Sequence, residues 1–220
     1  MEACIFDLDG VIVDTARYHY LAWKRLAAEL GFELTPEDNE RLKGVSRIQS
    51  LEIVLEIGGI QLDAEKKEQL AEKKNAWFNE AIAKMKPDEI FPGARTLITD
   101  LTNSGKKVAL ASSSKNAQLV VDRLEIRDLF DVIIDGTMIE HTKPDPEIFL
   151  LAAQRLRVRP EHCLVFEDAE AGVAAALAAG MKCVGIGSPE RLGNADLVLP
   201  AIGEFKASML SQFQQTRPPK

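Results

Sequence analysis

Short apolar runs that alternate with helical patterns constrain this chain more than any other feature of its sequence. Five such runs are spread over the 220 residues, at Ala3–Phe6, Val108–Ala111, Val132–Ile134, Cys163–Phe166 and Cys183–Ile186. Strands that alternate with helices form parallel sheets with both faces covered, which accounts for runs that are apolar throughout. The sequence therefore predicts an α/β fold, in which helices cover both faces of a Rossmann-like parallel sheet.

The interval between the first two runs breaks this rhythm. From about Thr15 to about Met85 the sequence has no convincing strand pattern, whereas helical patterns extend over Tyr20–Leu30 and Ala64–Ile82. Pro92-Gly93 marks the return to alternating strands and helices. We therefore expect an α/β core domain of residues 1–14 and 86–220, and an inserted α-helical cap domain of residues 15–85.

Composition argues against several classes of protein. The chain has 34 acidic and 27 basic residues, and its net charge of −7 disfavours nucleic-acid binding through bulk charge. Three cysteines without metal-ligand spacing suit a reducing compartment. No apolar run approaches the ~18 residues of a membrane span, and the N-terminus has no basic-then-apolar signal. We expect a cytoplasmic protein without nucleic-acid or membrane partners.

Two carboxylates stand two residues apart at the end of the first apolar run, in Asp7-Leu8-Asp9-Gly10. Side chains alternate along a strand, so Asp7 and Asp9 point the same way. Such like charges repel unless a cation lies beside them, and a protein keeps them for chemistry more readily than for stability. One carboxylate could attack as a nucleophile while the other moves a proton. The alternative is a simple turn, because Asp and Gly are both common in turns.

Polar side chains also follow three later apolar runs. Ser112-Ser113-Ser114-Lys115-Asn116 follows the second run, Lys143 stands before a proline turn after the third, and Glu167-Asp168 follows the fourth. Each has an ordinary explanation, such as a helix N-cap for serine or aspartate and a solvated position for the lysine. In open parallel sheets, however, ligands bind beyond the carboxyl ends of the strands. Together these residues could hold Mg²⁺, a phosphoryl group and a nucleophile at one edge.

These four segments resemble, in order, the four motifs of haloacid dehalogenase-superfamily phosphotransferases that carry a helical cap after the first strand. The resemblance implies that Asp7 is the nucleophile, which forms an aspartyl-phosphate, and that Asp9 is the general acid and base. It also implies that Ser112 and Lys143 hold the transferring phosphoryl group. The implied cofactor is Mg²⁺, with the expected ligands Asp7, Asp9 through its backbone carbonyl, and Asp168, and with Glu167 close by.

The predicted cap contains a basic, glycine-containing break that ends in Ser46-Arg47. Ser46 can cap a helix over about Ser46–Ile57, which is its simplest role. Arg47 falls in the first turn, where a positive charge opposes the helix dipole. A forked guanidinium beside exposed N–H groups would suit a second phosphate. A phosphatase of monophosphates needs no second phosphate site, whereas a mutase that passes through a bisphosphate does.

The same cap resembles that of the sugar-phosphate mutases in this superfamily. His19 and Trp23 are four residues apart and so share one helical face, although each alone would be unremarkable as a helix histidine and a core tryptophan. The resemblance implies an isomerase, expected to be a monomer, that interconverts β-glucose 1-phosphate and glucose 6-phosphate through a bisphosphate. The expected substrate-binding residues are Thr15, His19, Trp23, Leu42, Lys43, Gly44, Val45, Ser46, Arg47, Lys74, Ser112, Ser113, Ser114, Lys115, Asn116 and Lys143.

Two other functions remain open from the sequence. A cap-containing phosphatase of small sugar phosphates would share every core residue and would pass the phosphoryl group to water instead of sugar. A non-catalytic protein that binds phosphosugars would tolerate the loss of Asp7 or Asp9, yet both are present.

Overall fold

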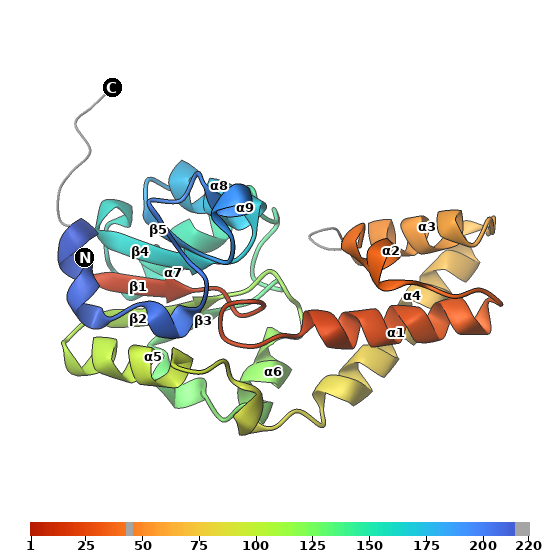
Figure 1. Ribbon diagram of the computed structural model, residues 1–220, viewed down its shortest axis with the longest axis horizontal. Helices are drawn as coiled ribbons and strands as arrows, with labels where there is room; N and C mark the ends of the chain where they lie inside the picture. The colour runs from red at the N-terminus through yellow and green to blue at the C-terminus, as the bar shows by residue number, and fades with distance from the viewer. Residues whose placement is uncertain (43–45, 214–220) are drawn as a thin grey trace. The chain divides into compact units, whose positions relative to one another are not determined.

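The computed structural model describes residues 1–42 and 46–213, which belong to two compact units. A sheet unit contains Met1–Asp14 and the chain from Lys86 onward, and a helical unit contains Thr15–Met85. Figure 1 shows the elements of both units.

Six parallel strands form the sheet, in the order β3-β2-β1-β4-β5-β6. They are β1 (Ala3–Phe6), β2 (Lys107–Ala111), β3 (Val132–Ile134), β4 (Cys163–Glu167), β5 (Lys182–Ile186) and β6 (Leu197–Leu199). The order reverses between the neighbours β1 and β4, as in doubly wound sheets. The predicted Rossmann-like α/β fold is therefore confirmed. The edge strand β6, which is three residues long and half-buried, was not predicted.

Helices and 3-10 turns cover both faces of the sheet (Figure 1). Helices α7 and α8 pack with Ile5 and Val165 in one hydrophobic cluster. On the opposite face α5 packs with β2 and with two C-terminal 3-10 turns. These elements are η1 (Pro87–Glu89), α5 (Ala94–Asn103), α6 (Ala117–Arg123), η2 (Arg127–Leu129), α7 (Glu147–Leu156), η3 (Pro160–His162), α8 (Glu170–Ala178), α9 (Pro189–Leu192), η4 (Ile202–Glu204) and η5 (Ala207–Phe213).

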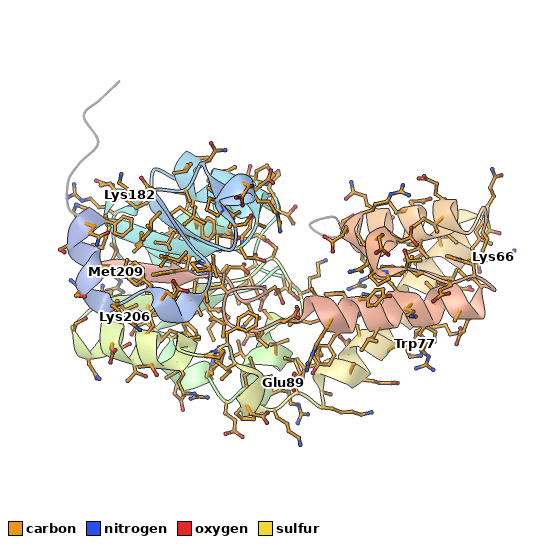
Figure 2. The ribbon with its side chains drawn as sticks, in the orientation of Figure 1. Lys66, Trp77, Glu89, Lys182, Lys206 and Met209 are labelled. Carbon is orange, nitrogen blue, oxygen red and sulfur yellow. The ribbon has the colours of Figure 1, made fainter. Side chains whose placement is uncertain are left out.

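The helical unit consists of α1 (Ala16–Glu29), α2 (Pro36–Glu40), α3 (Arg47–Ile57) and α4 (Ala64–Ile82). Helices α1 and α3 both pack against α4 around a core of apolar side chains that includes Leu26 and Val54. Exposed side chains such as Lys66 lie on the surface of this unit (Figure 2). Within residues 1–42 and 46–213, the structure has no helix with the length and apolar character that a bilayer crossing requires.

The two segments that connect the units are tied to each other inside the sheet unit. Val13, on the outgoing segment, forms β-bridges with Asp9 and with Ile90 on the returning segment. The Phe91 N–H donates to the Ile12 carbonyl at 2.8 Å. The chain therefore leaves and re-enters the sheet unit along two neighbouring paths.

Candidate active site

Asp7 and Glu167 lie side by side at the carboxyl ends of two neighbouring strands. Phe6 of β1 pairs in register with Phe166 of β4, and the Asp7 N–H donates to the Phe166 carbonyl at 3.0 Å. Both acidic side chains are buried. The strand order reverses between β1 and β4, and this is where open parallel sheets bind their ligands.

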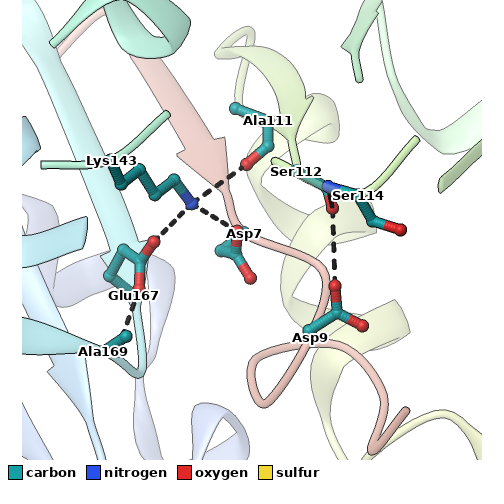
Figure 3. A network of polar contacts seen from close by, with 8 residues as sticks. All are labelled: Asp7, Asp9, Ala111, Ser112, Ser114, Lys143, Glu167 and Ala169. Carbon is teal, nitrogen blue, oxygen red and sulfur yellow. Dashed lines mark hydrogen bonds and ion pairs between the residues drawn. The ribbon is translucent and has the colours of Figure 1, made fainter. Parts of the chain in front are cut away.

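The Lys143 ammonium group lies between these two carboxylates (Figure 3). Its Nζ donates to Asp7 Oδ1 at 2.5 Å, to the Glu167 carboxylate and to the Ala111 carbonyl at 3.4 Å. The second Glu167 oxygen accepts the Ala169 N–H at 3.0 Å. Burial acts to lower the pKa of Lys143, but Asp7 and Glu167 outweigh it and raise that pKa above its ordinary range. Lys143 is therefore a fixed positive charge.

Burial and neighbouring carboxylates raise the pKa values of two acidic residues at this edge of the sheet, Asp168 and Asp7. Burial first, and then Glu167 and Asp9, raise the pKa of Asp168 to about 7. Burial also raises the pKa of Asp7 well above its ordinary value, although Lys143 opposes that rise. A further cation here would lower both pKa values and stabilise the ionised carboxylates.

Two glycines make room for the acidic side chains. Gly10 has a φ of +80°, and a Cβ at that position would lie 1.9 Å from Asp168 Oδ2. A Cβ on Gly172 would lie 1.9 Å from Glu167 Oε1. Asp168 therefore lies directly against the turn that follows Asp9, and only glycine permits that approach.

The loop after β2 brings hydroxyl and N–H groups to the same edge. Ser112 is buried, and its Oγ donates to Asp9 Oδ2 at 3.4 Å (Figure 3). The Ser114 N–H donates to Ser112 Oγ at 3.1 Å, and the Asn116 N–H donates to Ser114 Oγ at 3.2 Å. Serine hydroxyls thus fold the loop back on itself directly before α6. Such a turn presents polar groups to a bound anion.

The other two predicted residues of this loop differ in exposure. The Oγ atom of Ser113 is buried and has no hydrogen-bond partner among the described residues. Lys115 is exposed to solvent. The structure gives neither side chain a direct contact with Asp7, so their part in substrate binding stays a prediction.

Asp135 is a buried acidic residue at this edge that the sequence analysis missed. It follows β3 directly, and its carboxylate accepts the Thr137 N–H at 2.8 Å and Gln118 Nε2 at 3.1 Å. The next N–H, of Gly136, donates to the Ser114 carbonyl at 3.2 Å. Asp135 therefore supports the serine loop. The available signal was an aspartate directly after an apolar run, the pattern that also marks Asp7.

Four of the acidic residues at this edge, Asp7, Asp9, Glu167 and Asp168, fit a magnesium site by their chemistry. Their donors are the hard carboxylate oxygens that Mg²⁺ prefers, and their mutual repulsion calls for a cation. Within the described residues, however, no three His, Cys, Asp or Glu side chains converge in a metal-binding arrangement. The Lys143 ammonium instead lies between two of the four. The predicted metal ligands are Asp7, Asp9, Glu167 and Asp168.

A second cluster of basic side chains lies within the helical unit. Lys74 of α4 is only 1% exposed, and its Nζ lies 2.7 Å from His19 Nδ1 and 4.5 Å from the centre of the Trp23 ring. The His19 ring stacks on Phe78 with 3.8 Å between centroids. A protonated lysine can only donate, so Nδ1 accepts and the His19 proton resides on Nε2 while Lys74 is charged.

Positive charge gathers in this cluster. Burial, and then the Arg47 charge, lower the pKa of Lys74 to about 7. Burial, and then Lys74 and Arg47, lower the pKa of His19 to about 3. These residues come from α1, α3 and α4, so the unit folds the Lys74 and Arg47 charges together against their repulsion, while His19 is neutral near pH 7. Such an arrangement suits an anionic ligand.

The remaining predicted residues of the helical unit have structural positions. Trp23 and Leu42 belong to its hydrophobic core, and Thr15 is buried directly before α1. Ser46 Oγ accepts the Gln49 N–H at 3.3 Å and so caps α3, the role that is simplest for it. A role for these residues in substrate binding stays a prediction. Three further predicted residues lie outside the described part of the chain, namely Lys43, Gly44 and Val45.

Comparison with known proteins connects this geometry to a family. Residues 1–180 match the haloacid dehalogenase-like hydrolase family. The chain is 45% identical over 221 residues to a Bacillus subtilis (strain 168) protein named beta-phosphoglucomutase, with 99% of this chain and 97% of the relative covered. A Thermotoga maritima protein named phosphorylated carbohydrates phosphatase is 36% identical, with 83% of each chain covered.

A solved structure resembles the whole chain. The crystal structure of beta-phosphoglucomutase from Clostridium difficile is 41% identical to it and superimposes with a TM-score of 0.87. The match covers 97% of this chain and 96% of the other.

Proposed function

Because the chain belongs to the haloacid dehalogenase-like hydrolase family, we propose that it is a β-phosphoglucomutase, which interconverts β-D-glucose 1-phosphate and glucose 6-phosphate. The full-length similarity to a curated and a solved mutase supports this isomerase activity. The observation that carries the proposal is the presence of two basic groups suited to phosphate, Lys143 in the sheet unit and the Arg47–Lys74 cluster in the helical unit. A bisphosphate intermediate has two phosphates to bind.

Asp7 is the proposed phosphoryl carrier. Its carboxylate attacks the phosphorus, the P–O bond to the sugar oxygen breaks, and an aspartyl-phosphate forms. In the first half-reaction the phosphorylated Asp7 donates its group to the 6-hydroxyl of β-glucose 1-phosphate. In the second, Asp7 takes the 1-phosphate from the bisphosphate and releases glucose 6-phosphate. The enzyme ends phosphorylated, as it began.

Asp9 is the proposed proton carrier. It removes the proton from the attacking sugar hydroxyl in one half-reaction and returns a proton to the leaving sugar oxygen in the other. The Ser112 hydroxyl donates to its carboxylate at 3.4 Å, which favours an Asp9 orientation toward the serine loop.

Lys143 and the serine loop would hold the transferring phosphoryl group. The Lys143 ammonium, already 2.5 Å from Asp7 Oδ1, offsets the repulsion between an anionic nucleophile and an anionic substrate. Mg²⁺ bound by Asp7, Asp9, Glu167 and Asp168 would add charge neutralisation at the phosphoryl oxygens. The raised pKa values of Asp168 and Asp7 support that ligand set, because a bound cation would stabilise both carboxylates.

Arg47 would bind the phosphate that is not being transferred. It stands at the start of α3, where a helix exposes N–H groups and a positive partial charge. Its charge already acts on Lys74 and His19. Arg47, Lys74 and His19 together would bind the phosphate at either end of the bisphosphate.

The test is an assay of β-glucose 1-phosphate with Mg²⁺ and a trace of β-glucose 1,6-bisphosphate. We expect glucose 6-phosphate to form in near-stoichiometric yield, with EDTA and Asp7→Asn each abolishing turnover. Free phosphate as the main product would instead identify a phosphatase, as the similarity to the Thermotoga maritima protein allows. Binding of the substrate without either product would contradict both enzymatic functions.

A further inference from the structure

Glu147, the first residue of α7, holds the segment that precedes this helix. Its Oε1 accepts the Glu140 N–H at 3.0 Å and its Oε2 accepts the His141 N–H at 2.8 Å. The His141 ring also contacts it, with Nδ1 3.1 Å from Oε2. One carboxylate thereby closes residues 140–147 into a ring with two backbone hydrogen bonds.

Lys143 is a member of this ring. A second set of bonds tightens the ring around it, because the Asp145 N–H donates to the Thr142 carbonyl at 3.1 Å and the Glu147 N–H donates to Asp145 Oδ1 at 2.9 Å. Thr142 and Asp145, which flank Lys143-Pro144, are thus held in place. The backbone position of Lys143 determines where its long side chain ends, and its Nζ must reach Asp7.

The composition of the ring makes the carboxylate important. Pro144 and Pro146 have no N–H group, so they contribute no backbone donor to a turn. An acidic residue in the first turn of a helix also interacts with the helix dipole, and this is the simpler explanation for Glu147. That explanation does not require both of its oxygens to face the backbone of residues six and seven positions earlier.

We propose that Glu147 is a positioning residue for Lys143, which acts by holding the turn that carries the lysine. This inference rests on the proposed function, because it assumes that Lys143 acts on a transferring phosphoryl group. A displacement of about 1 Å in a group that acts on a reaction centre lowers rates by roughly a hundredfold. The turn around Lys143 has no strand or helix of its own to prevent such a displacement.

The first experiment replaces Glu147 with alanine. We expect kcat for β-glucose 1-phosphate to fall about tenfold to a hundredfold, while KM changes by less than about threefold because the helical unit is unchanged. Amide exchange should accelerate at Glu140 and His141. The control is His141→Ala, which removes the imidazole side chain but keeps both backbone hydrogen bonds to Glu147. This variant should retain near wild-type kcat.

The decisive experiment is a double-mutant cycle with Lys143→Ala, read out as phosphate release from acetyl phosphate. If Glu147 acts through Lys143, adding Glu147→Ala to Lys143→Ala should leave the remaining rate unchanged within about twofold. An equal loss in both backgrounds, or a Glu147→Ala enzyme with wild-type kcat, would overturn the proposal. Should Glu147→Ala fail to fold, Glu147→Gln keeps one acceptor oxygen and should show an intermediate loss of kcat.

The outcome is distinguishable from a failure of the proposed function. Acetyl phosphate reports on phosphoryl transfer to Asp7 without any sugar. A wild-type protein that releases phosphate from sugar phosphates, and makes no glucose 6-phosphate, would refute the mutase assignment and leave the Glu147 cycle interpretable. A wild-type mutase with additive Glu147 and Lys143 effects would refute only the positioning role.

Discussion

Phe6 and Phe166 stack face to face in the sheet, with 4.5 Å between ring centroids and an interplanar angle of 5°. Each is followed in the chain by a carboxylate of the candidate site, Asp7 and Glu167. Side chains alternate along a strand, so a pair of rings on one face sets a pair of carboxylates on the other. The buried rings therefore fix the separation of two like charges that would otherwise move apart.

Lys143→Met should destabilise the protein and lower phosphoryl transfer to a small residual rate. The substitution leaves Asp7 and Glu167 buried without their ammonium partner, which costs about 3–5 kcal/mol in comparable buried pairs. Urea unfolding checks this in the presence of EDTA. The control Lys67→Met breaks an exposed pair with Glu52 and should cost about 1 kcal/mol or less.

A second substitution separates stability from activity in the same variant. Lys143→Met/Glu167→Gln removes one of the two unpaired charges, so it should recover part of the lost free energy of unfolding. It should recover none of the activity. A double variant no more stable than Lys143→Met would show that the buried charges are not what destabilises it.

Gly10→Ala should lower activity more than its effect on stability explains. A Cβ there would lie 1.9 Å from Asp168 Oδ2, so the carboxylate must move. Gly105→Ala is the matched control, because Gly105 has a similar φ of +76° but nothing within 4 Å of the added Cβ. Both should lose on the order of 1 kcal/mol to backbone strain. Only Gly10→Ala should lose activity, and equal kcat values for the two variants would contradict the contact.

Lys74→Met should stabilise the protein more at low pH than at high pH. Burial lowers the pKa of Lys74 from 10.5 to about 7, so between these values the unfolded chain binds one more proton than the folded chain. The wild-type free energy of unfolding therefore rises as pH rises from about 7 toward 10.5, and the penalty for the buried charge is fully present below about pH 7. Below pH 7 the variant should be more stable by on the order of 2 kcal/mol.

Urea unfolding between pH 6 and pH 9 measures this difference. Lys73→Met, which removes an exposed neighbour paired with Glu29, controls for the loss of a lysine from α4. The same pH trend in both variants would contradict an effect specific to the buried ammonium group of Lys74.

Arg47→Ala should weaken sugar-phosphate transfer far more than reaction with a small acyl phosphate. Loss of a charge-assisted contact to phosphate costs roughly 2–3 kcal/mol, so kcat/KM for β-glucose 1-phosphate should fall about thirtyfold to 150-fold. Acetyl phosphate has no second phosphate, and its hydrolysis should change little. The control is Arg41→Ala, which removes an exposed arginine paired with Glu56. Equal losses for both substrates would remove the second-phosphate role.

Much of the fold could be predicted because its signals are strong and local. The helical pattern over Ala64–Ile82 matches α4 to the residue. Four of the apolar runs match β1, β2, β4 and β5, which are buried on both faces. The three-residue edge strand β3 was also predicted, whereas β6 (Leu197–Leu199), which is equally short and pairs only with β5, was not. Its pairing depends on the sheet that is already present.

The candidate site was predictable where chemistry shows in the residue type. Asp7, Asp9, Ser112 and Glu167 carry a polar group at or soon after the end of a strand, and Lys143 lies in the loop between β3 and α7. The structure brings them together. Their roles stay predictions.

Contacts to the backbone could not be predicted. The partners of Glu147 are the N–H groups of Glu140 and His141, and every residue except proline has an N–H group. Lys74 and His19 were expected on grounds of resemblance, but their direct contact depends on how α1 packs against α4.

The bridge between Val13 and Ile90 has a consequence for how such a protein can change over evolutionary time. Paired β segments lie only about 5 Å apart, so the chain leaves the sheet unit at Val13 and returns to it at Ile90 at nearly the same point. An inserted unit whose two ends lie close together can be replaced by another unit without altering the order of the strands. The acidic edge of the sheet could then be inherited unchanged while the inserted unit is replaced.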